Sequence, residues 1–234
     1  MSETAAFVGA AGGVGTTRVT LGVGRLVAGS GVDTAVLDAA YGTQGLSDRV
    51  SGRLDPDMTA LCLSETPLEE GLVDVPVEGA GRLAVCPARA PFERLARANA
   101  PEAAERFGEH VDAAARQFER VLVDTPPVAT NPAVAAATAA GTVAVVCDEA
   151  RAESAVPRTE DRLADIGVES AATLVTRTDA HPDADVAVPA FDSGTPAENG
   201  SPAHDALADA AERLVDAPIE RARSEGLLGR VPFR

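Results

Sequence analysis

A glycine-rich segment near the start of the chain decides the fold, and it reads Phe7-Val8-Gly9-Ala10-Ala11-Gly12-Gly13-Val14-Gly15-Thr16-Thr17-Arg18. An apolar run at residues 5–8 precedes the glycines, and a helical pattern at residues 17–28 follows them. Glycines let a backbone wrap around an anion, and the N-terminus of a helix points N–H groups at that anion. The segment therefore predicts a strand, a phosphate-binding loop and a helix, in that order.

The loop lacks the lysine that such loops usually carry before their final Ser or Thr. That position is Thr16, and the hydroxyl of Thr17 follows it. Arg18 lies two residues further on, about 200° around a helix, so we expect its side chain to point away from the phosphates. A purely structural alternative is that Thr16 and Thr17 cap the helix. The sequence thus predicts a phosphate-binding frame with little positive charge.

The composition is strongly acidic. The 234 residues are enough for one large domain with a good core. All 20 basic residues are arginine, and 36 acidic residues bring the net charge to −16. An acidic surface without lysine stays hydrated in concentrated salt, which favours a halophilic, specifically haloarchaeal, source. A genome of high GC content, which favours Arg and Ala codons, is the alternative.

Short apolar runs alternate with longer amphipathic ones. Strands are predicted at residues 4–8, 34–37, 82–86, 120–123, 142–147, 172–176 and 186–188. Helices are predicted at residues 17–28, 91–99, 101–119, 132–139, 149–166 and 203–215. This alternation predicts an α/β fold, a mostly parallel sheet of about seven strands with helices on both faces. Ligands of such folds bind beyond the carboxyl ends of the strands, where residues 9–17, Asp38 and Asp124 fall.

Three later motifs follow the loop in order. Asp38 ends the second predicted strand, residues 121–127 read Val-Leu-Val-Asp-Thr-Pro-Pro, and Val188-Pro189 comes near the end. Together with the loop, these motifs resemble the MinD/ParA branch of the deviant P-loop (SIMIBI-class) ATPases. The resemblance extends over residues 4–216 and implies a P-loop NTPase fold.

The resemblance also implies a site for ATP or ADP with Mg²⁺. Thr17, Asp38 and Asp124 match the positions on the metal side of that site, where oxygen ligands suit a hard cation. Thr176 and Pro189 match positions near the adenine. The full set of implied binding residues is Gly12, Gly13, Val14, Gly15, Thr16, Thr17, Asp38, Asp124, Thr176 and Pro189.

The chain departs from the family at positions that carry chemistry. Ala11 and Thr16 stand where relatives have lysine, and Ala40 stands where they have the aspartate that orients the attacking water. Thr176 replaces the asparagine that reads adenine. Losing one aligned stabiliser of developing charge costs about 3–4 kcal/mol of barrier, so we assign no catalytic residue.

The first hypothesis is a degenerate, non-hydrolysing binding or scaffolding module in cell positioning, polarity, motility or division. The alternative is an active or slow Mg-dependent ATPase of the same family. Partitioning of DNA is less favoured, because binding DNA needs a basic surface and no nucleic acid is expected here. We expect a protein partner. A homodimer is also open, but Ala11 removes the lysine that bridges the nucleotide dimer of relatives, so ATP should not drive it.

The chain divides into a domain at residues 1–217 and a short basic tail at residues 218–234. The tail has four arginines against two glutamates, and its apolar residues are broken up by glycine and proline. It predicts either weak contact with a membrane or partner, or an ordinary tail that packs on its own domain. No signal peptide and no apolar run of about 18 residues is present, so we expect a cytoplasmic protein, at most peripheral at a membrane.

Overall fold

The computed structural model describes residues 3–191 and 197–221. They form a sheet of eight strands in the order β3-β4-β2-β5-β1-β6-β7-β8. The strands are β1 (Glu3–Gly9), β2 (Thr34–Asp38), β3 (Val73–Val75), β4 (Leu83–Cys86), β5 (Arg120–Thr125), β6 (Thr142–Asp148), β7 (Ala172–Thr176) and β8 (Val186–Val188). This sheet confirms the predicted α/β class.

Each neighbouring pair of strands is parallel except β3 and β4, which run antiparallel. The seven predicted strands are all present. The eighth, β3, was missed because it has three residues and Asp74 between its two valines faces solvent, which is too short a pattern to recognise. As an antiparallel edge strand, β3 does not change the position of the loop.

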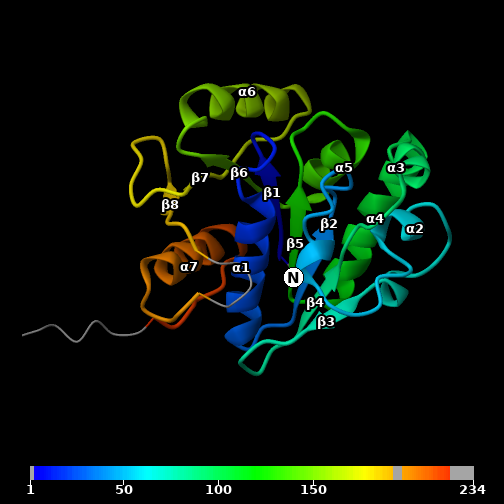
Figure 1. The fold of residues 1–234 in the computed structure, drawn as a ribbon, viewed down its shortest axis with the longest axis horizontal. Helices are drawn as coiled ribbons and strands as arrows, with labels where there is room; N and C mark the ends of the chain where they lie inside the picture. The colour runs from blue at the N-terminus through cyan, green and yellow to red at the C-terminus, as the bar shows by residue number, and fades with distance from the viewer. Residues whose placement is uncertain (1–2, 192–196, 222–234) are drawn as a thin grey trace, which may run out of the picture.

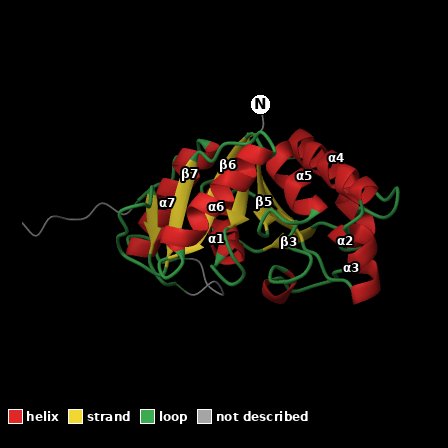
Figure 2. Ribbon diagram, turned by 90° about the horizontal axis from the view of Figure 1, so that it is seen from above, coloured by secondary structure: helices red, strands yellow, loops and turns green. Residues whose placement is uncertain are grey.

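The helices cover both faces of the sheet (Figures 1 and 2). Helices α1 and α7 pack against each other over one face, and α4 and α5 pack together over the other. The helices are α1 (Thr16–Gly29), α2 (Met58–Leu61), α3 (Phe92–Ala98), α4 (Pro101–Gln117), α5 (Asn131–Ala139), α6 (Ala152–Asp165) and α7 (Pro202–Val215). All six predicted helices appear, and the single turn of α2 and two 3₁₀ turns, η1 (Ser47–Arg49) and η2 (Leu68–Glu70), are additional.

Helix α1 lies close to its neighbours because it carries glycines at the contact points. A Cβ atom on Gly24 would lie 3.0 Å from Cγ2 of Val36, and one on Gly22 would lie 3.0 Å from Cδ1 of Leu207. Its other buried positions pack into the same core as β1, whose residues 5–8 are fully buried. This tight packing fixes the N-terminus of α1, and therefore the glycine loop, against the sheet.

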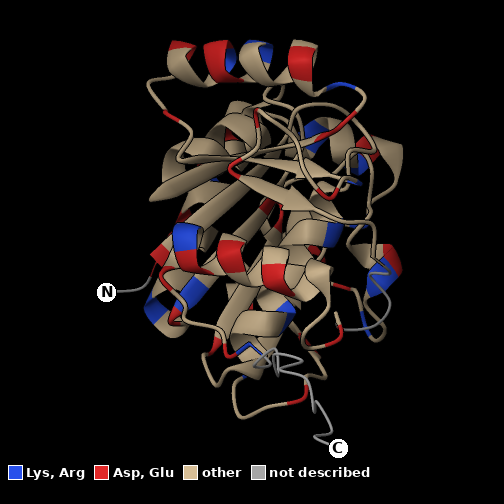
Figure 3. Cartoon of the chain, turned by 90° about the vertical axis from the view of Figure 1, so that its left-hand side faces the viewer, with Lys and Arg blue, Asp and Glu red and all other residues tan. Residues whose placement is uncertain are grey.

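Acidic residues are spread along the helices in view in Figure 3, with arginines between them. The first residues of the predicted tail pack back on the domain, since Ile219 contacts the core and Arg221 pairs with Asp209 and Glu212 of α7. Residues 222–234 lie outside the described residues, so the prediction of membrane or partner contact by the tail stays a prediction. Among the described residues, no helix is both long and apolar enough to span a membrane.

Candidate functional site

The glycine loop connects β1 to α1 at the carboxyl end of the strand. Gly13 and Gly15 have φ angles of 76° and 96°, a region that side chains disfavour, and Gly15 is the N-cap of α1. A Cβ atom on Gly9 would lie 2.7 Å from Oγ1 of Thr16, so glycine is needed there for the first turn of the helix to fold over the strand. The predicted order of strand, glycine loop and helix is therefore present.

Three consecutive backbone carbonyls of the loop accept hydrogen bonds from side chains elsewhere in the chain. Arg151 Nη1 donates to the Gly12 carbonyl at 2.9 Å, and Arg177 Nη2 donates to the Gly13 carbonyl at 2.8 Å. The Thr176 hydroxyl donates to the Val14 carbonyl at 2.6 Å. We call Arg151, Thr176 and Arg177 the carbonyl clamp. The clamp therefore fixes the path of the loop backbone at three successive residues.

Asp148, at the end of β6, joins the two arginines of the clamp. Its carboxylate accepts hydrogen bonds from Arg151 Nε at 2.9 Å and from Arg177 Nη1 at 3.1 Å. The hydrogen bonds from Arg151 hold the pKa of Asp148 below its usual value. The carboxylate therefore stays charged and orients both guanidinium groups toward the loop.

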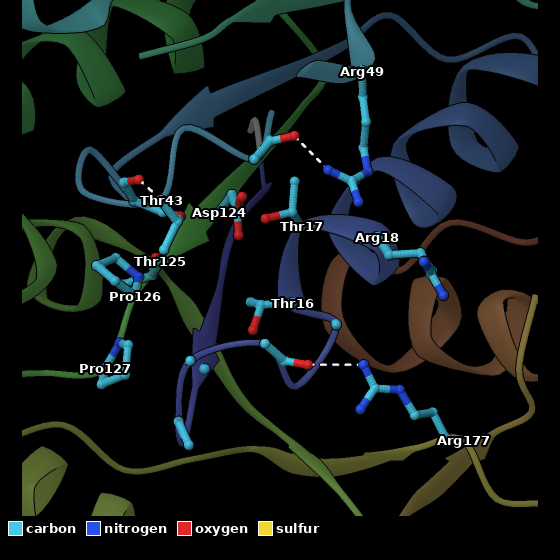
Figure 4. A pocket seen from close by; sticks show the side chains of 17 residues that line it. Thr16, Thr17, Arg18, Thr43, Arg49, Asp124, Thr125, Pro126, Pro127 and Arg177 are labelled. Carbon is cyan, nitrogen blue, oxygen red and sulfur yellow. Dashed lines mark hydrogen bonds between the residues drawn. The ribbon is translucent and has the colours of Figure 1, made fainter. Parts of the chain in front are cut away.

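A cavity of about 280 Å³ lies between this loop and the ends of β2 and β5 (Figure 4). Six of the predicted site residues line it, namely Gly12, Gly13, Gly15, Thr16, Thr17 and Asp124. The other four do not. Val14 is buried in the core, Asp38 is fully buried and does not line the cavity, and Thr176 and Pro189 line a separate hollow.

Asp124 is a buried carboxylate that faces the cavity. It is 1% exposed, and its oxygens make no hydrogen bond of normal geometry among the described residues, although the Thr17 hydroxyl lies close enough to lower the pKa of the carboxyl. Burial raises the pKa of Asp124 to about 6, while the nearby Thr17 hydroxyl and Arg49 guanidinium oppose that rise. A buried carboxylate without partners is costly unless a cation or donor joins it. The Asp124 carboxylate is therefore placed where it could bind a metal ion in the cavity.

Asp38 has a different environment from Asp124, although the two are directly opposite each other on β2 and β5. Its Oδ1 accepts from the Ala40 N–H at 2.8 Å and its Oδ2 from the Ala88 N–H at 3.0 Å. Burial and the neighbouring Asp124 charge raise the pKa of Asp38 to about 8. In this arrangement Asp38 holds the loops after β2 and β4 together.

Three arginines line the cavity, and sequence reasoning assigned a site role to none of them. Arg18, Arg49 and Arg177 share the lining with a single carboxylate, Asp124, in a chain whose net charge is −16. Arg18 is directed away from Thr16 and Thr17, as helix geometry predicts (Figure 4). Arg49 comes from the 3₁₀ turn η1, eleven residues after Asp38, and no motif marks it. The lining is positive overall, which suits an anion.

The small hollow beside the loop contains the residues predicted to lie near adenine. It is lined by Thr176 and Pro189 together with Gly15, Arg18 and Phe191, and its volume is about 10 Å³. Gly15 lines this hollow and the main cavity, so the two are adjacent. A space of that size holds no more than about one water, so a base would have to displace side chains to enter.

Comparison with known proteins supports the fold. No family model matches the chain, and no curated protein sequence matches it. Among solved structures, it is similar to cobyrinic acid a,c-diamide synthase from Mycobacterium smegmatis with bound ATP analogue and magnesium, with a TM-score of 0.71, 17% identity, and coverage of 91% of this chain and 93% of that one. It is also similar to the septum site-determining protein MinD complexed with Mg-ADP from Pyrococcus horikoshii, with a TM-score of 0.70, 18% identity, and coverage of 91% and 95%.

A third similar structure is the MinC:MinD cell division protein complex of Aquifex aeolicus, with a TM-score of 0.58, 21% identity, and coverage of 76% of this chain and 69% of that one. At these identities the likeness establishes the fold alone. The chain shares its fold with MinD and with cobyrinic acid a,c-diamide synthase.

Proposed function

We propose that this protein binds ATP or ADP with Mg²⁺ in the cavity of Figure 4, hydrolyses ATP poorly or not at all, and serves as a binding or scaffolding module in cell positioning, polarity, motility or division. Two features support binding. The loop presents N–H groups at the N-terminus of α1, and the lining of the cavity carries more arginine than carboxylate.

The residues that line the cavity fit a magnesium ion. Asp124 offers a buried carboxylate whose oxygens make no hydrogen bond of normal geometry among the described residues, and the Thr17 hydroxyl lies close enough to lower its pKa. Magnesium is usually held by one or two carboxylates, water and the phosphates of a nucleotide. When bound, the ion would neutralise phosphate charge. Asp38 would support it only through the backbone that it holds, because both of its oxygens already accept backbone hydrogen bonds.

One observation carries the proposal of weak hydrolysis. Ala11, Thr16 and Ala40 all line the cavity, and none of them carries a charge. The predicted losses of the lysine at position 16 and of the water-orienting carboxylate at position 40 therefore fall where phosphates and attacking water would lie, and the lysine lost at Ala11 is the one that would reach the nucleotide of a partner subunit. Each such loss costs about 3–4 kcal/mol of transition-state stabilisation, or roughly 10²–10³ in rate. Binding survives better, because backbone N–H groups and arginine remain.

The alternative of a slow ATPase is favoured by the arginines in the cavity lining, since a guanidinium can stabilise charge on a transferred phosphate. For partners, we propose a protein that recognises the surface of this domain. A homodimer, where it forms, would not depend on ATP, because Ala11 provides no amine to reach a nucleotide in the partner subunit.

Hydrolysis by the native chain and by an Ala11→Lys, Thr16→Lys double variant tests the proposal. The native chain should release no phosphate above background, and the variant should bind Mg-ATP more tightly and release phosphate measurably. The matched control is an Ala135→Lys, Thr138→Lys variant, which adds the same charge on α5 away from the cavity and should behave like the native chain. Clear turnover by the native chain would favour the slow ATPase instead.

A further inference from the structure

We propose that Arg49 takes the role of the absent lysine at position 16 and binds the outer phosphates of the nucleotide; this inference rests on the proposed nucleotide site. Arg49 is remote from the glycine loop in the sequence and belongs to the 3₁₀ turn η1. The fold nevertheless brings its side chain to the lining of the cavity. The structure therefore supplies a cation to the site from a different element.

The position of the guanidinium is set by Gly45. Arg49 Nη1 donates to the Gly45 carbonyl at 2.6 Å, which fixes one end of the group. A Cβ atom on Gly45 would lie 3.2 Å from Oγ1 of Thr17 and 3.6 Å from Nη1 of Arg49. The two side chains thus lie against the same glycine, and Figure 4 shows both directed toward the space beside Asp124. Arg49 is placed on the metal side of the site, where the outer phosphates of a nucleotide would lie.

The electrostatics agree with this placement. Arg49 is close enough to Asp124 to lower the pKa of that carboxyl, so its charge acts inside the cavity. A guanidinium has five N–H donors in a planar fork. The planar fork matches the oxygens of a phosphate. In a chain without lysine, arginine is the residue that can carry this charge.

The other arginines of the lining are less suited to the role. Arg177 also lines the cavity, but its guanidinium donates to the Asp148 carboxylate and to the Gly13 carbonyl. Arg18 is directed away from Thr16 and Thr17 (Figure 4). Arg49 therefore replaces the lysine in charge but not in sequence position, and it approaches the phosphates from the side opposite to the loop.

Calorimetric titration of Mg-ATP, Mg-ADP and AMP into native, Arg49→Ala, Arg49→Lys and Arg53→Ala proteins tests this inference. Arg53 is exposed, does not line the cavity and provides the matched loss of one charge. We expect Arg49→Ala to weaken Mg-ATP and Mg-ADP binding by about tenfold or more and to leave AMP binding unchanged. Arg49→Lys should retain part of the affinity, and Arg53→Ala should match the native chain.

A second variant separates a phosphate contact from a structural role. Adding Thr16→Lys to Arg49→Ala should restore Mg-ADP affinity, because the two cations would serve the same phosphates, and thermal unfolding checks that each variant is folded. Equal Mg-ADP affinity in the native and Arg49→Ala proteins would overturn the role of Arg49 while leaving the proposed site intact. No binding of Mg-ATP or Mg-ADP by the native chain would instead overturn the proposed function itself.

Discussion

Asp124 and Asp38 show how two carboxylates at matching strand ends acquire different roles. The sequence placed both at the correct edge of the sheet, because strand ends can be recognised from apolar runs. It could not show that the loops after β2 and β4 turn two N–H groups onto Asp38 and none onto Asp124. Such a difference depends on backbone geometry over long sequence separations, which a single sequence does not reveal.

These carboxylates predict a magnesium effect that depends on pH. Burial raises the pKa values of Asp38 and Asp124, so the folded protein retains protons that the unfolded chain releases. The free energy of unfolding of the metal-free protein therefore falls as pH rises from about 4 to about 8. Magnesium needs the charged carboxylate. Magnesium should therefore raise the thermal unfolding midpoint more at about pH 8 than at about pH 5.5.

Thermal unfolding with and without magnesium chloride, at several pH values, measures this effect. Asp124→Asn should abolish it, and Asp112→Asn, which removes an equal charge from the exposed side of α4, should preserve it. A magnesium effect of equal size at all pH values, or one that persists in Asp124→Asn, would mean that the ion binds elsewhere.

At the scale of elements, the carbonyl clamp ties the glycine loop to β6 and β7. Asp148→Ala should release both arginines. Their side chains are 40% and 51% exposed, so solvent screening makes the contribution of these ion pairs to stability small. We therefore expect the loop of the variant to open only about five times more often than that of the native chain. Hydrogen exchange of the amides at residues 10–17 measures this opening. Asp161→Ala, an exposed change on α6, is the control, and equal exchange in the two variants would exclude a role for the clamp.

Substitutions at two glycines test how closely the elements around them pack. A Cβ atom on Gly79, which has a φ of 146°, would lie 2.1 Å from the Gly29 carbonyl oxygen at the end of α1. Gly79→Ala should cost about 2 kcal/mol in the free energy of unfolding. In contrast, a Cβ atom on Gly108 in α4 would have no neighbour within 4 Å. Gly108→Ala should therefore raise the free energy of unfolding by about 0.5–1 kcal/mol, because alanine favours a helix more than glycine does. Denaturant unfolding distinguishes these outcomes, and a loss at both positions would contradict the packing.

Most elements could be read from the sequence because their apolar patterns are long. Strands such as β4 and β6 are almost wholly apolar, and prolines mark the starts of α4 and α7. The clamp could not be predicted. It joins Arg151 and Arg177 to carbonyls that lie 139 and 164 residues away, and neither arginine stands in a pattern that points to the loop.

For the whole molecule, the net charge of −16 predicts a strong dependence of stability on salt. Repulsion between like charges opposes the compact state and is screened by added ions. The unfolding midpoint should therefore rise steadily as KCl increases from about 0.1 M to about 2 M. A midpoint that stays flat or falls over this range would argue against adaptation to concentrated salt, and would favour codon bias as the origin of the composition.

The predicted whole-molecule architecture, a parallel sheet with helices on both faces, is confirmed by the strand order and by the shared fold with MinD. The charge of the site was predicted less well. Sequence reasoning recognised the missing lysines, because they belong to a motif, but it missed Arg49, whose place at the cavity depends on the path of the chain after β2.

The most direct measurement is a calorimetric titration of Mg-ADP into the native chain, with Asp124→Asn as the paired variant. The account predicts saturable binding of one nucleotide per chain that weakens markedly when Asp124 is replaced. Absence of heat and of any shift in unfolding midpoint at millimolar Mg-ADP would contradict it, and would mean that the glycine loop of this protein has only a structural role.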